Sequence, residues 1–144
     1  MRPIRVLVVE DSLVFRELLV QNMKRDTAIQ VVATARDPYE ARDAIIKYKP
    51  DVMTLDVELP RMNGIDFLRK LMPQYPLPVL VISSLNDKVF DALNAGAVDF
   101  VAKPAVSNRA QLEEFIRNEL LVKIKIASTA KISNIKRTVA VQEP

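Results

Sequence analysis

The chain has 144 residues, enough for one domain with a sizeable core, and its 49% apolar and 27% charged residues are typical of a globular protein. It contains no histidine and no cysteine, which excludes His-dependent nucleophilic catalysis, His- or Cys-ligated metal sites and disulfides. The net charge of +3 arises from scattered cations after residue 104, so no nucleic-acid partner is expected. No apolar run approaches the roughly 20 residues of a membrane span, so we expect a cytoplasmic protein without membrane insertion.

Strand-like and helix-like segments alternate five times along the chain. Residues 4–9, IRVLVV, form an apolar run typical of a strand covered on both faces, and residues 13–25 follow with helical spacing of apolar side chains. Further strands are predicted at 31–35, 51–55, 79–83 and 99–102, and further helices at 38–48, 64–72, 87–94 and from 109 to about 127. This alternation predicts an α/β fold with a doubly wound parallel sheet and helices on both faces.

The domain is predicted to span residues 1–127. Residues 128–144 have no apolar periodicity long enough to pack, so they are predicted to form a linker or a disordered tail. The helix before this tail has a capping signal at its start, Asn108 with Gln111 three residues later.

Polar side chains stand where the predicted strands end. They are Glu10 and Asp11 after the first strand, Asp56 and Glu58 after the third, Ser83 after the fourth and Lys103 after the fifth. Because the carboxyl ends of parallel strands meet at one edge of a sheet, we expect these side chains to converge there. Each one alone is explained as a helix cap or a surface residue, but together the acids repel one another unless cations offset their charge. Lys103 supplies one such charge, and oxygen ligands without His or Cys favour Mg²⁺ as another.

A free carboxylate beside a carboxylate-bound Mg²⁺ is suited to phosphoryl transfer. Asp56 is charged at neutral pH, and we interpret it as a nucleophile that attacks phosphorus and forms an acyl phosphate. Lys103 and Ser83 would then stabilise the phosphoryl oxygens, by charge and by a hydrogen bond.

Four segments carry a family resemblance: VVEDS (8–12), LDVELPRMNG (55–64), VISS (81–84) and GAVDFVAKP (96–104). With them, the chain from residue 4 to about 127 resembles the receiver domain of two-component response regulators. The resemblance implies a flavodoxin-like sheet of strand order 2-1-3-4-5 and a histidine kinase as the phosphoryl donor.

The resemblance also implies a set of Mg²⁺ ligands. Asp11 and Asp56 would bind the ion directly, together with the backbone carbonyl of Glu58. Glu10 takes the position of a second acid that acts through water, and it is Glu here where Asp is more usual.

The same resemblance implies a switch. Ser83 matches the hydroxyl position, Lys103 the lysine that contacts the phosphoryl group, and Phe100 the aromatic residue that turns inward on activation. Phe100 is equally well explained as an ordinary core aromatic of the fifth strand. In this family the bond between Lys103 and Pro104 is commonly cis.

A narrower resemblance involves the chemotaxis-specific protein-glutamate methylesterases. Residues 55–72, the VISSLN stretch and residues 96–104 resemble the regulatory domain of that family. In that family a C-terminal domain demethylates receptor glutamates and can deamidate glutamines, and this chain has no histidine with which to do so. We therefore expect a regulatory fragment or a free-standing relative. Its expected partners are a histidine kinase of a chemotaxis-type pathway and a C-terminal methylesterase domain or chemoreceptor.

One alternative to a phosphorylated receiver remains open, and a second is disfavoured. Residues 83–96 span about two residues fewer than in typical receivers, which shortens the fourth helix and leaves the possibility of a stand-alone or degenerate receiver that acts as a protein-binding module. A metal-dependent phosphatase is disfavoured, because residues 56–60, DVELP, lack the second Asp and the Thr of such enzymes.

Overall fold

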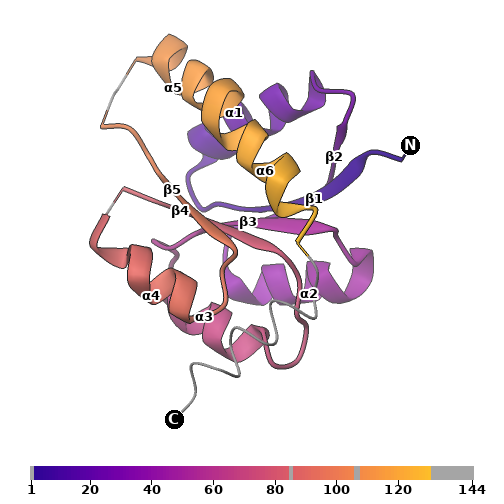
Figure 1. Cartoon of the computed structure of the whole chain (residues 1–144), viewed down its shortest axis with the longest axis vertical. Helices are drawn as coiled ribbons and strands as arrows, with labels where there is room; N and C mark the ends of the chain where they lie inside the picture. The colour runs from indigo at the N-terminus through magenta and orange to yellow at the C-terminus, as the bar shows by residue number, and fades with distance from the viewer. Residues whose placement is uncertain (1, 85, 106–107, 131–144) are drawn as a thin grey trace.

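A computed structural model describes residues 2–84, 86–105 and 108–130 of the chain. It has an α/β fold with one five-stranded parallel sheet of order β2-β1-β3-β4-β5, which confirms the predicted flavodoxin-like, doubly wound architecture (Figure 1). The strands are β1 (Ile4–Val9), β2 (Ile29–Ala35), β3 (Val52–Asp56), β4 (Val79–Ser83) and β5 (Asp99–Ala102).

Helices cover both faces of the sheet. They are α1 (Leu13–Lys24), α2 (Pro38–Tyr48), α3 (Gly64–Leu71), α4 (Val89–Asn94), α5 (Arg109–Phe115) and α6 (Leu121–Ala127). In Figure 1, α1, α5 and α6 lie on one side of the sheet, and α2, α3 and α4 lie on the other. A π-helical turn, Ile116–Leu120, joins α5 to α6 within the predicted C-terminal helix. The predicted tail lies mostly outside the described residues, at 131–144.

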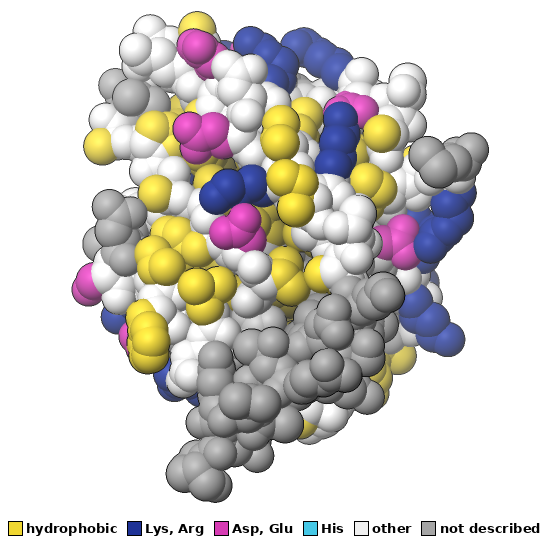
Figure 2. All heavy atoms as spheres, in the orientation of Figure 1, with side chains coloured by type: hydrophobic (Ala, Val, Ile, Leu, Met, Phe, Trp, Pro, Cys, Tyr) yellow, Lys and Arg dark blue, Asp and Glu magenta, His cyan; other side chains and the backbone are white. Residues whose placement is uncertain are grey.

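The fourth helix is short, as predicted. A 3₁₀ turn, Asn86–Lys88, precedes the six residues of α4. Two apolar side chains of α4 face solvent: Phe90 is 77% exposed and Leu93 is 38% exposed. Figure 2 shows apolar side chains gathered on this face of the molecule, over the region of β5 and α4.

Side-chain caps fix where the helices begin. Asp37 accepts the N–H of Glu40 at 2.9 Å and Pro38 occupies the first helical position of α2, as the sequence predicts. Ser12 accepts the N–H of Phe15 at the start of α1, and Asn63 accepts the N–H of Ile65 at the start of α3. The caps at Ser12 and Asn63 anchor the two loops that follow β1 and β3.

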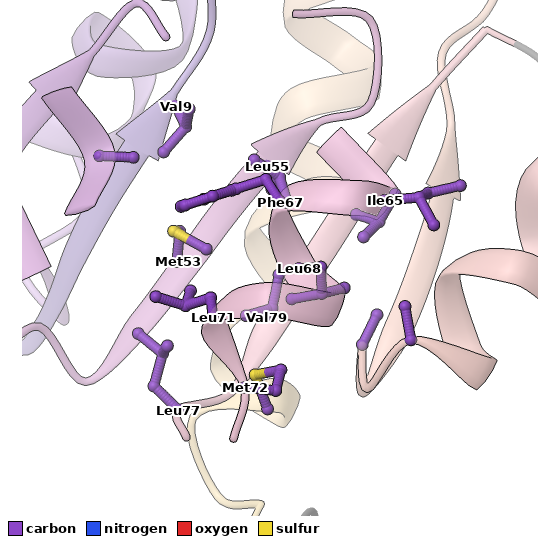
Figure 3. Close-up of a cluster of buried hydrophobic side chains, with 14 of the residues drawn as sticks. Val9, Met53, Leu55, Ile65, Phe67, Leu68, Leu71, Met72, Leu77 and Val79 are labelled. Atoms are coloured by element: carbon purple, nitrogen blue, oxygen red, sulfur yellow. The ribbon is translucent and has the colours of Figure 1, made fainter. Parts of the chain in front are cut away.

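Strand residues alternate between two apolar layers, one on each face of the sheet. On one face, Leu55 of β3 and Val79 of β4 pack with Leu68 and Leu71 of α3, as Figure 3 shows. On the other, Val6 and Val8 of β1 belong to the layer formed with α1, α5 and α6. This double burial explains why the strands read as continuous apolar runs. Within the described ranges, no helix is both long and apolar enough to cross a membrane.

Asp51 ties the start of β3 to β1. Its carboxylate accepts the backbone N–H of Arg5 at 2.9 Å and the guanidinium of Arg2 at 2.7 Å. Burial by itself raises the pKa of Asp51, but the bonds from Arg5 and Arg2 outweigh it, so this pKa lies below its ordinary value.

Asp51→Asn is expected to lower the free energy of unfolding by about 1 kcal/mol at pH 7. Because the pKa of Asp51 is lower in the folded chain than in the unfolded chain, this stabilisation is present above the unfolded pKa and is lost as the pH falls through the folded one. Urea unfolding of wild type and variant should therefore differ at pH 7 and converge toward pH 3. Asp43→Asn, at an exposed position 3.7 Å from Arg42, is the matched control. A difference for Asp51→Asn that persists undiminished at pH 3 would contradict the assignment.

Candidate functional site

The strand register brings the predicted residues to one edge of the sheet. Asp56 pairs with Ile82, and Ser83 pairs with Ala102, so the carboxyl ends of β3, β4 and β5 lie level with one another. The backbone N–H of Lys103 donates to the carbonyl of Ser83 at 2.8 Å. The edge is therefore held together by the same ladder that builds the sheet.

Asp56 is buried at this edge with both carboxylate oxygens engaged. Its side chain is 4% exposed. One oxygen, Oδ1, accepts the N–H of Glu58 at 2.8 Å, and the other, Oδ2, accepts from the ammonium of Lys103 at 2.9 Å. These two hydrogen bonds, one from a charged donor and one from the backbone, offset the cost of burying the Asp56 carboxylate.

Glu10 lies beside this pair. Its Oε2 accepts the N–H of Ser12 at 3.0 Å, and its Oε1 lies 3.4 Å from the ammonium of Lys103. Burial, with the nearby charge of Asp56, raises the pKa of Glu10 to about 7, although Lys103 and the Ser12 N–H oppose the shift. Burial lowers the pKa of Lys103, but Asp56 and Glu10 outweigh it, so that pKa is raised and Lys103 stays a cation.

Glu58 contacts the hydroxyls that follow β4. Ser83, which is fully buried, donates to Glu58 Oε1 at 3.1 Å, and Ser84 donates to the same oxygen at 2.8 Å. The carboxylate thus bridges the end of β3 to the end of β4. The sequence analysis predicted a role only for the backbone carbonyl of Glu58, as a Mg²⁺ ligand, and none for Ser84.

The first strand's loop carries Asp11, which is exposed. Its backbone is fixed by Arg16 of α1, whose guanidinium donates to the carbonyl of Glu10 at 2.9 Å and approaches the carbonyl of Asp11 at 3.4 Å. Arg16 was not singled out from the sequence, because an arginine on a predicted helix is most simply interpreted as a solvated residue. Its spacing, five residues after Asp11 on the first turns of a helix, was the available signal.

The side chains of the predicted metal ligands do not form a preformed metal site. Among residues 2–84, 86–105 and 108–130, no three acidic side chains stand close enough to hold a metal ion together. The donor chemistry nevertheless fits a hard divalent cation, since every candidate ligand is an oxygen. Within this described part, the buried Oε1 of Glu10 accepts no hydrogen bond, and its neighbour is the Lys103 ammonium at 3.4 Å. The set fits Mg²⁺ provided that Asp11 turns in from solvent.

Phe100 and the bond after Lys103 complete the predicted set. Phe100 is buried, 8% exposed, in the apolar layer formed with α2, α3 and α4, which agrees with the core interpretation, and its switch role stays a prediction. The carbonyl of Phe100 accepts from Lys123 of α6 at 3.1 Å. The described residues contain no cis peptide bond, so the bond between Lys103 and Pro104 is trans here, whereas it is commonly cis in the family that the sequence resembles.

A hollow of about 710 Å³ lies elsewhere, at the opposite edge of the sheet. Its lining includes Ile4, Asp51 and Pro78, which stand at the amino ends of β1, β3 and β4. It shares no residue with the acidic edge.

Comparison with known proteins adds the family. The sequence profile of the response regulator receiver domain matches residues 6–117. The chain is 64% identical over 132 residues to protein-glutamate methylesterase/protein-glutamine glutaminase 2 of Syntrophomonas wolfei, a match that covers 92% of this chain and 38% of that protein. It is 54% identical over 139 residues to the protein-glutamate methylesterase/protein-glutamine glutaminase of Syntrophotalea carbinolica, covering 94% of this chain and 39% of that protein. The chain thus spans about two fifths of the length of these relatives.

The fold comparison agrees. The crystal structure of the response regulator domain of Thermotoga maritima CheB superposes with a TM-score of 0.81 at 39% sequence identity. That match covers 90% of this chain and 99% of the CheB domain. The likeness therefore extends over the whole of a solved regulatory domain.

Proposed function

Since this chain belongs to the family of response regulator receiver domains and is similar to the receiver of CheB methylesterases, we propose that Asp56 accepts a phosphoryl group and that the domain acts as a phosphorylation-dependent switch. The observation that carries the proposal is the placement of Asp56. It is a buried carboxylate at a strand end, held by the ammonium of Lys103 and the N–H of Glu58.

The proposed donor is a phosphohistidine of a histidine kinase. A carboxylate oxygen of Asp56 attacks phosphorus, the bond between phosphorus and the histidine nitrogen breaks, and that nitrogen leaves with the electron pair. Lys103 already contacts Asp56, so its ammonium can follow the negative charge onto the phosphoryl oxygens. Bound Mg²⁺ would neutralise part of the charge on those oxygens. Asp11, Asp56 and the carbonyl of Glu58 would hold the ion, with Glu10 acting through water.

The proposed switch works through Ser83. In the structure described, its hydroxyl donates to Glu58. Phosphoryl oxygens on Asp56 would compete for that hydroxyl with more charge than a single carboxylate oxygen carries. Withdrawal of Ser83 from Glu58 would loosen the link between the ends of β3 and β4. Phe100 on the neighbouring strand β5 would then turn inward.

The similarity to methylesterases suggests the output. We propose that phosphorylation regulates a protein-glutamate methylesterase effector in a chemotaxis-type pathway in the cytoplasm, with a chemoreceptor as the final target. The shortness of α4 supports the second candidate, a receiver that works as a protein-binding module, because α4 presents Phe90 and Leu93 to solvent. The two candidates differ in whether binding of a partner protein depends on phosphorylation of Asp56.

Intact-mass spectrometry after incubation with acetyl phosphate, with and without Mg²⁺, tests the proposal. Wild type should gain one phosphoryl group only when Mg²⁺ is present, and the added mass should be released by hydroxylamine, as an acyl phosphate is. Asp56→Asn should gain none. Asp66→Asn, an exposed acid on α3, is the control and should behave as wild type. Uptake of a phosphoryl group by Asp56→Asn, on the tryptic peptide that contains position 56, would overturn the assignment. No uptake by wild type would leave the binding module as the function.

A further inference from the structure

The aromatic ring of Phe15 lies against the ammonium of Lys103. The Nζ atom is 4.7 Å from the ring centroid, within the range of a cation–π contact. Phe15 is 7% exposed, and its backbone N–H donates to the cap residue Ser12. The ring is thereby fixed to the first turn of α1, at the same edge as the acids. Helical periodicity explains Phe15 as a core residue, but it does not explain this second contact.

The ring differs in kind from the other neighbours of the ammonium. Lys103 Nζ lies 2.9 Å from Asp56 Oδ2 and 3.4 Å from Glu10 Oε1, and both contacts are with carboxylates. Phosphoryl transfer converts the carboxylate of Asp56 into an acyl phosphate, so that contact must change during the reaction. The attraction of the ring face for a cation does not change with this step.

We propose that Phe15 is a positioning residue that holds the Lys103 ammonium at the strand edge before and after phosphoryl transfer. The kinetic consequence rests on the proposed function, whereas the contact itself does not. An aliphatic side chain at position 15 could fill much of the same core volume, but it has no ring face of negative electrostatic potential to attract a cation. The inference therefore separates the electrostatic property of the ring from its size.

A fluorinated ring tests this separation. Placing 3,4,5-trifluorophenylalanine at position 15 keeps the apolar bulk and withdraws electron density from the ring face. The rate of Mg²⁺-dependent phosphoryl uptake from acetyl phosphate should fall about threefold to tenfold, the range that corresponds to loss of one cation–π contact. The same analogue at position 115 is the matched control. Phe115 is 8% exposed and belongs to the same apolar layer, so uptake there should stay within about twofold of wild type.

Equal losses at positions 15 and 115, or no loss at position 15, would overturn the proposal. A second measurement needs no phosphate. In protein labelled with ¹³C at the lysine ε-carbon, the Lys103 signal, assigned by its absence in Lys103→Arg, should be shifted upfield by the ring current of Phe15. The shift should vanish in Phe15→Leu and persist in Phe115→Leu.

The two measurements distinguish a failure of the proposed function from a failure of the inference about Phe15. Wild type that takes up no phosphoryl group contradicts the proposed function, and the ring-current shift then decides alone whether Phe15 holds Lys103. A Lys103 signal without the upfield shift overturns the inference, whatever the rate of uptake.

Discussion

Replacing Lys103 by Met is expected to lower the free energy of unfolding by about 3 kcal/mol at pH 8 in metal-free buffer. The ammonium lies between Asp56 and Glu10, whose side chains are 4% and 3% exposed, and it is the cation that contacts both. Methionine keeps most of the aliphatic stem and removes the ammonium, with its charge and its hydrogen bond to Asp56. Two buried carboxylates would then lie side by side with no cation between them, which is among the more costly arrangements in a protein interior.

The loss should depend on pH, and its sign follows from the pKa of Glu10. Burial and the charge of Asp56 already raise the pKa of Glu10 to about 7 in the presence of Lys103, and removal of Lys103 takes away an opposing influence. The folded variant would therefore retain a proton that the unfolded chain releases. Stability falls with rising pH wherever the folded state binds more protons, so the variant should lose more stability at pH 8 than at pH 5.

Urea unfolding at pH 5 and pH 8, with EDTA present, measures both expectations. The double variant Lys103→Met with Asp56→Asn should recover part of the loss, because only one buried carboxyl group remains and it can stay protonated. Lys70→Met, at an exposed position on α3, should change the free energy of unfolding by less than about 0.5 kcal/mol. A loss below about 1 kcal/mol for Lys103→Met at both pH values would show that the carboxylates do not depend on this cation.

Most of the fold could be predicted because local signals agree with one another. The apolar run of 4–9 is buried on both faces, and the Asp37–Pro38 pair starts α2 as capping chemistry requires. The π-helical turn at Ile116–Leu120 could not be predicted, since one extra residue in a turn hardly changes an apolar pattern of helical period. The residues at its two ends, Ile116 and Leu120, are both fully buried in the core.

The candidate site could be predicted as a set of residues, but not as a set of contacts. Strand ends and parallel topology are enough to bring Asp56, Ser83 and Lys103 together. Which oxygen Ser83 contacts depends on side-chain rotation, and the structure gives it to Glu58. In the same way, the burial pattern marks Phe15 as a core residue without revealing that its ring lies against Lys103.

Gly64 shows how closely the loop after β3 fits the strand it follows. A Cβ atom at this position would lie 2.8 Å from the carbonyl oxygen of Asp56 and 2.8 Å from the Cα of Val57. Both are backbone atoms that cannot rotate away. Val57 is held on one side by its N–H bond to Ile82, at 3.1 Å, and on the other by its carbonyl, which accepts from Gly64 at 2.9 Å. The absence of a side chain at Gly64 therefore sets how near α3 can approach Asp56.

Gly64→Ala is expected to lower the free energy of unfolding by about 2 kcal/mol, because the added methyl group must push α3 away from the backbone of Asp56 and Val57. Alanine's better helix propensity offsets this by less than about 1 kcal/mol at the first position of a helix. Lys70→Ala, later in the same helix and exposed, should leave stability within about 0.5 kcal/mol of wild type in urea unfolding.

The displacement should also reach the chemistry. Movement of the Asp56 carbonyl would shift its carboxylate away from the ammonium of Lys103, now at 2.9 Å, and from the N–H of Glu58, now at 2.8 Å. Gly64→Ala should therefore take up phosphoryl groups from acetyl phosphate more slowly than wild type, even under conditions where it is fully folded. Lys70→Ala should keep the wild-type rate. A Gly64→Ala protein as stable and as readily phosphorylated as wild type would mean that the loop yields without moving Asp56, and that the position of the nucleophile is set by the sheet alone.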